Sequence, residues 1–167
     1  MESRAKLFGH SIHPMLIVFP LGLLGTAVVF DVLHLVLGSP LMAGVAWWLI
    51  VAGVIGGLLA APFGLVDWLA IPKGTRAKRI GALHGGGNVV VLLLFGASAV
   101  ARSAAPDAPV GLALLFSFAG IGLALVTAWL GGELVARLGV GVTPNAHLDA
   151  PSSLSAATVE PQPRLTR

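Results

Sequence analysis

Residues 14–37 read PMLIVFPLGLLGTAVVFDVLHLVL. Crossing the hydrocarbon core of a bilayer takes about 20 predominantly apolar residues, and this stretch is long enough. Three further apolar stretches follow it, at residues 41–66, 85–101 and 110–132. Because a backbone in lipid must satisfy its own hydrogen bonds, each stretch is expected to be an α-helix. The sequence therefore predicts four transmembrane helices, at about residues 14–37, 41–68, 84–102 and 109–134.

The composition agrees with a protein that lies in lipid. Charged residues make up 10% of the 167 residues and hydrophobic residues 56%, whereas a soluble domain is about a quarter charged. The net charge of +3 lies in the loops, so we expect no nucleic-acid partner. The chain has no cysteine, which excludes disulfides, thiolate metal sites and covalent c-type haem. The absence of a phosphate loop, a nucleophile elbow or an HExxH motif argues against an ordinary soluble enzyme.

The positions of lysine and arginine predict the orientation. Only Arg102 falls on one side of the expected membrane. The other side holds Arg4, Lys6, Lys73, Arg76, Lys78, Arg79, Arg137, Arg164 and Arg167. The positive-inside rule then places the N-terminus, the central loop and the C-terminus in the cytoplasm. The expected fold is an all-α, up-down-up-down four-helix bundle in residues 1–142, followed by a disordered cytoplasmic tail at residues 143–167.

Small residues recur every four positions in the second expected helix. One track contains Gly53, Gly57 and Ala61, and the next contains Gly56, Ala60 and Gly64. Such tracks let helix backbones approach closely in lipid. We expect them to pack inside the bundle; the alternative is a homodimer face.

Several polar residues lie where lipid should exclude them, and an ionisable residue inside a membrane segment is a functional hypothesis by default. With the orientation above, six of them fall near the cytoplasmic face: His10, His13, Asp67, His84, Asn88 and Glu133. Near the outer face lie Asp31 and His34. We interpret these two as either a proton-handling pair or a satisfied polar contact.

Counting about 100° per residue places the ionisable groups of the first helix on one stripe. The stripe holds His10, His13, Asp31 and His34, and it is expected to face the bundle interior. Pro14 is expected at the first helical position, with His13 just before it as a cap-like residue. In an up-down bundle the first and third helices are diagonal partners, so His13 and His84 should face each other. The run Gly85 to Gly87 leaves a gap that could admit a planar cofactor.

Three functions follow from these residues. The leading hypothesis is a b-type haem between His13 and His84, with His10 as a substitute ligand and Asn88 as an orienting group. The second is a non-haem iron, zinc or manganese ion, bound by His10, His13, Asp67, His84 and Glu133. The third is a packing or partner-binding module with no cofactor. In that case the histidines and carboxylates snorkel, cap helix ends or pair with Arg76, Arg79 or Arg137.

Some of these residues also fall in motifs of a known family. The motifs are Gly9-His10-Ser11-Ile12-His13-Pro14, Phe19-Pro20, Asp31, Gly64-Leu65-Val66-Asp67-Trp68, His84, Gly131-Gly132-Glu133-Leu134-Val135 and Gly139-Val140-Gly141-Val142. Together they resemble the bacterial membrane proteins called domain of unknown function 2231, over about residues 9–142. Related domains are sometimes joined to Rieske-type or cytochrome c-type domains. The resemblance therefore implies a bacterial inner membrane and an electron-transfer context, with a separate redox protein as partner.

Overall fold

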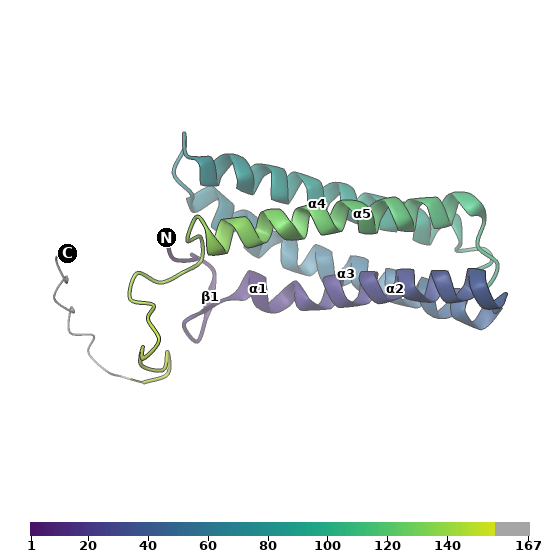
Figure 1. Cartoon of the computed structure of the whole chain (residues 1–167), viewed down its shortest axis with the longest axis horizontal. Helices are drawn as coiled ribbons and strands as arrows, with labels where there is room; N and C mark the ends of the chain where they lie inside the picture. Colours follow the sequence, from purple (N-terminus) through teal and green to yellow (C-terminus); the bar gives the residue numbers. More distant parts are fainter. Residues whose placement is uncertain (156–167) are drawn as a thin grey trace.

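The computed structural model describes residues 1–155, and its regular elements are helices apart from a short N-terminal hairpin (Figure 1). Its elements are β1 (Lys6–Leu7), β2 (His10–Ser11), α1 (Ile12–Leu16), α2 (Val18–Leu37), α3 (Pro40–Ala70), α4 (Arg76–Ala101) and α5 (Gly111–Ala136). Helices α1 and α2 together form one span, and this span, α3, α4 and α5 are each long and apolar enough to cross a membrane. The predicted all-α fold with four membrane helices is confirmed.

Successive helices run in opposite directions and pack as two antiparallel hairpins, α2 with α3 and α4 with α5 (Figure 1). Contacts of α3 with α4 and of α2 with α5 close the bundle, so α2 and α4 lie diagonally. The N-terminus, the turn between α3 and α4, and the end of α5 meet at one end of the bundle, which we call the His13 end. The other end, with the α2–α3 and α4–α5 connections, is the Arg102 end. Which end faces the cytoplasm stays a prediction.

The outer surface of the bundle is apolar. Val100, Trp48 and Leu58 are 75%, 66% and 60% exposed. Such contiguous apolar exposure is unfavourable in water and is ordinary in contact with lipid tails.

The first span begins earlier than expected. Ser11 is the N-cap of α1, and His13 lies inside the helix rather than before it. Pro14 is tolerated in this first turn because the N–H that it lacks would have no helical partner there. The short break at Ile17 lies where Pro20 cannot donate a hydrogen bond to the carbonyl of Leu16.

The third span begins at Arg76, well before the predicted start near residue 84. Thr75 is its N-cap, and the Thr75 hydroxyl accepts a hydrogen bond of 3.1 Å from the backbone N–H of Lys78. Hydropathy detects only the part of a helix that is apolar, so the polar first two turns were missed. As a result His84 lies in the interior of α4.

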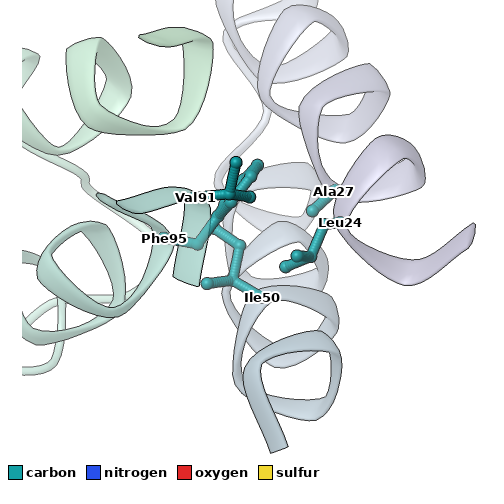
Figure 2. Packing of buried hydrophobic residues seen from close by; sticks show 5 residues of the cluster. All are labelled: Leu24, Ala27, Ile50, Val91 and Phe95. Atoms are coloured by element: carbon teal, nitrogen blue, oxygen red, sulfur yellow. The ribbon is translucent and has the colours of Figure 1, made fainter. Parts of the chain in front are cut away.

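The bundle core contains Leu24, Ala27, Ile50, Val91 and Phe95 (Figure 2). Glycines let the helices approach at this level. A Cβ added to Gly53 would lie 2.6 Å from Leu24, and one added to Gly57 would lie 2.5 Å from Leu92. These glycines of the small-residue tracks therefore pack within the bundle. Association of a second copy through the exposed Ala61 side stays a prediction.

After α5 the described chain, to residue 155, forms turns without a helix or strand. The rest of the predicted disordered tail, residues 156–167, lies outside the described residues.

Candidate functional site

Two histidines from diagonal helices meet at the His13 end of the bundle. His13 comes from α1 and His84 from α4, and both are half-buried. Their ring centroids are 6.5 Å apart and their planes are at 89°. The predicted approach of these two imidazoles across the bundle is present.

Each imidazole is held by a backbone carbonyl of the neighbouring helix. The Nδ1 atom of His13 lies 3.1 Å from the carbonyl oxygen of Ala60, and that of His84 lies 2.8 Å from the carbonyl oxygen of Thr127. A carbonyl can only accept, so Nδ1 donates in both rings. In a neutral imidazole Nε2 then keeps its lone pair, which is the form that binds a metal.

A glycine lies beside each ring, one helical turn beyond the carbonyl that holds it. A Cβ added to Gly64 would lie 2.8 Å from Cε1 of His13, and a Cβ added to Gly131 would lie 3.0 Å from Cε1 of His84. The first contact is shorter than real Cβ contacts and the second is tighter than most of them, so a side chain at either position would push the ring from its place.

Asn88 and Thr127 fix His84 further. The Thr127 hydroxyl donates to Oδ1 of Asn88 over 3.0 Å, which turns the Asn88 amide nitrogen toward His84. That nitrogen donates to the His84 carbonyl over 3.0 Å and lies 3.3 Å from Nε2 of the ring. Asn88 therefore contacts the residue that it was expected to orient.

The glycine run after His84 does not open toward the rings. Gly85 and Gly86 are exposed on the outside of the bundle, with no heavy atom within 4 Å of an added Cβ. Gly87 instead packs against Thr127, where an added Cβ would lie 2.5 Å from Cγ2. This run lets α4 and α5 approach each other.

The other three proposed metal ligands lie with different partners. His10 is on β2, with Nε2 3.2 Å from the Ser153 hydroxyl. Glu133 accepts a 2.6 Å hydrogen bond from Arg76, the helix-end ion pair that was the alternative for this residue. Within residues 1–155 no group of three or more His, Asp or Glu side chains is arranged to hold a metal ion.

Asp67 binds the N-terminal segment, a role that the sequence did not suggest. Its carboxylate accepts hydrogen bonds from the Ser3 hydroxyl and the Arg4 backbone N–H, each of 2.7 Å, and from the Ala5 N–H at 3.3 Å. The N-terminal amine donates to the Gly139 carbonyl over 2.8 Å. These contacts hold residues 1–11 across the ends of α3 and α5.

The Arg102 end contains a fully buried ion pair. The guanidinium of Arg102 donates to both carboxylate oxygens of Asp31, over 2.7 and 3.2 Å, and both side chains are inaccessible to solvent. It also donates to the hydroxyls of Ser98 and Ser117, each over 2.9 Å. Only its Nε atom has no partner.

This ion pair corrects two sequence interpretations. Arg102 was expected to lie on the outer side of the membrane, at the end of the third expected helix, but its side chain extends from the end of α4 back into the bundle, as helical side chains do. Asp31 does not pair with His34, whose Nδ1 lies 2.9 Å from the Ser39 carbonyl. The sequence did contain a signal for this ion pair. A buried carboxylate such as Asp31 is stabilised by a cation, and Arg102 is the only lysine or arginine on that side of the predicted membrane.

These features define a class of protein: a four-helix membrane bundle with a paired-histidine site at one end and a buried ion pair at the other. The chain belongs to the family described as "Predicted membrane protein (DUF2231)", which matches residues 9–144. Comparisons with curated proteins and with solved structures found no match.

Proposed function

We propose that this membrane protein binds a b-type haem between His13 and His84 and acts in membrane electron transfer. The observation that carries the proposal is that both imidazole rings are held by the same kind of hydrogen bond. Each donates through Nδ1 to a carbonyl of a neighbouring helix, so Nε2 carries the lone pair that a metal would take. In His84 this atom lies 3.3 Å from the Asn88 amide nitrogen, and a metal would take the place of that contact.

The separation of the rings suits one metal atom. A metal–imidazole bond is about 2.0–2.1 Å, so two imidazoles that share a metal have ring centroids about 6 Å apart. The measured separation is 6.5 Å. The Asn88 amide beside Nε2 of His84 can keep its hydrogen bond to the His84 carbonyl when Nε2 is used by a ligand.

The number of ligands favours haem over a non-haem ion. A protein-bound zinc or iron ion usually needs three or four protein ligands, and His10, Asp67 and Glu133 have other partners here. A haem would bring four ligands of its own, so His13 and His84 would be enough to hold it. When bound, it would supply one-electron transfer. The residues of the chain would orient the imidazoles, through Ala60, Thr127 and Asn88.

The orientation proposed from the sequence gains support from Arg102. Because this side chain is buried in an ion pair, the loops of the Arg102 end present no lysine or arginine to solvent. Under the positive-inside rule, this difference between the two ends supports the proposal that the His13 end faces the cytoplasm. A separate redox protein on that side is the proposed partner.

Absorption spectroscopy tests the proposal. Protein purified in detergent from haem-replete bacteria should show a Soret band with one haem per chain, and His84→Ala and His13→Ala should each abolish it. His34→Ala, which removes an imidazole from the other end of the bundle, is the matched control and should leave the band unchanged. A colourless wild-type protein would sink the proposal. If elemental analysis of that colourless protein found a stoichiometric metal, the non-haem alternative would replace it.

A further inference from the structure

The two hairpins hold their histidines with the same device. In the first, His13 donates to the carbonyl of Ala60 and lies on Gly64; in the second, His84 donates to that of Thr127 and lies on Gly131. His84 follows His13 by 71 residues, while Thr127 and Gly131 follow Ala60 and Gly64 by 67. One offset therefore relates the first span to α4, and the other relates α3 to α5.

The same two offsets relate most of the buried positions. Between α2 and α4 they pair Pro20 with Val91, Leu24 with Phe95, Ala27 with Ser98, and Asp31 with Arg102; Val91, Phe95, Ser98 and Arg102 are buried like their partners. Between α3 and α5 they pair Ala46 with Ala113, Ile50 with Ser117, Gly53 with Gly120, and Ala60 with Thr127, all buried.

Packing contacts repeat as well. A Cβ added to Gly53 would lie 2.6 Å from Leu24, and one added to Gly120 would lie 2.8 Å from Phe95, the residue equivalent to Leu24. The two hairpins therefore use equivalent glycines to seat equivalent core side chains.

Equivalent residues also meet each other. His13 and His84 are in ring contact, and Asp31 and Arg102 form an ion pair of 2.7 Å. In a bundle whose alternate helices are parallel, the two halves are related by a two-fold rotation about the bundle axis. A residue can touch its own equivalent only where both lie at that axis. The axis therefore passes through both polar sites.

We infer that the bundle is a pseudo-two-fold repeat of one helical hairpin, and that the His13–His84 site takes a centre coordinated identically from two sides rather than an asymmetric organic substrate. The ligand half of this inference rests on the proposed function. At the Arg102 end the two equivalent positions are Asp31 and Arg102, and their paired side chains occupy the axis. At the His13 end both halves keep an imidazole.

The repeat is tested without any ligand, by exchanging side chains between the halves. Leu24→Phe combined with Phe95→Leu exchanges equivalent positions, so each side chain arrives beside an equivalent glycine. Ile50→Phe combined with Phe95→Ile is the matched control, because it exchanges two residues of the same core cluster that are not equivalent.

The apparent melting temperature in detergent should stay within a few degrees of wild type for the Leu24/Phe95 exchange. It should fall well below for the single variants Leu24→Phe and Phe95→Leu and for the Ile50/Phe95 exchange. If the Leu24/Phe95 exchange lowers the melting temperature as much as the control exchange, the repeat is overturned.

The ligand half is tested by His13→Met and His84→Met. If the bound centre lies on the axis, the two variants should give the same change in the visible spectrum. A spectrum lost in one variant and retained in the other would overturn this half. A colourless wild type would refute the proposed function, while the core exchange would still report on the repeat.

Discussion

The two ends of the bundle place polar groups at equivalent positions, yet they differ in how completely those groups are paired. At the Arg102 end, Asp31 and Arg102 are fully buried and bind each other and two serine hydroxyls. At the His13 end, the half-buried imidazoles of His13 and His84 each donate from Nδ1 to a carbonyl and lie edge to face. Asn88 adds an amide nitrogen 3.3 Å from Nε2 of His84, so this end is paired less completely than the Arg102 end. A polar cluster that is saturated by its own partners fixes the structure, whereas an unsaturated one remains available to bind a ligand.

The largest effect is expected from breaking the saturated cluster. Arg102→Met leaves the Asp31 carboxylate buried without a cation, and removing one partner of a buried pair typically costs about 3–5 kcal/mol. We expect a correspondingly lower free energy of unfolding in detergent and less protein in the membrane fraction.

The double variant Asp31→Leu with Arg102→Met is the control for this prediction. It removes both charges together, and such replacement of a buried pair by apolar groups is often neutral or stabilising. The double variant should therefore be more stable than Arg102→Met alone. Equal losses in both variants would mean that packing, not charge, accounts for the effect.

A smaller effect on stability, with a larger effect on binding, is expected at the unsaturated cluster. Gly64→Ala and Gly131→Ala each place a Cβ 2.8–3.0 Å from a histidine ring, which must then move. Because groups that orient metal ligands are worth about 10–100-fold in affinity, we expect haem affinity to fall at least tenfold. The free energy of unfolding should change by only about 1 kcal/mol, because alanine is favoured over glycine in a helix by about that much and this gain offsets part of the cost of moving the ring.

Gly122→Ala serves as the control for the two glycine variants. It lies on α5, is exposed, and would meet no heavy atom within 4 Å. Haem titration, followed by the Soret band, should give wild-type affinity for this variant. Wild-type affinity in Gly64→Ala and Gly131→Ala as well would mean that the ring positions do not decide binding.

The contrast between the two ends was only partly visible in the sequence. Hydropathy gave the four spans, and the alternation of antiparallel helices brought His13 and His84 together. The Asp31–Arg102 pair was missed because hydropathy counts where a residue lies along the chain, not where its side chain extends. The contact between Asp67 and Ser3 joins residues 64 positions apart with no periodic signal. The repeat of the hairpins was missed because it conserves burial and contacts more than residue identity.

The smallest effect on ligand binding is expected from a third polar cluster, the contacts of Asp67 with the N-terminal segment. Asp67→Ala removes the acceptor for Ser3, Arg4 and Ala5 at a half-buried site on the surface. We therefore expect the free energy of unfolding to fall by about 2 kcal/mol, because water can replace part of the three lost hydrogen bonds at this half-buried site. The released segment should instead be cleaved faster by trypsin after Arg4 and Lys6, measured by mass spectrometry of the intact chain.

Glu133→Ala is the matched control for Asp67→Ala, because it removes another helix-end carboxylate of the His13 end, which binds Arg76 and not the N-terminal segment. Cleavage after Arg4 and Lys6 should then stay at the wild-type rate.

The same two variants, Asp67→Ala and Glu133→Ala, separate the metal hypotheses, because neither carboxylate is a ligand in a bis-histidine haem site. Both variants should keep the Soret band, whereas loss of bound metal in either one would restore that carboxylate as a ligand and return the site to the non-haem alternative.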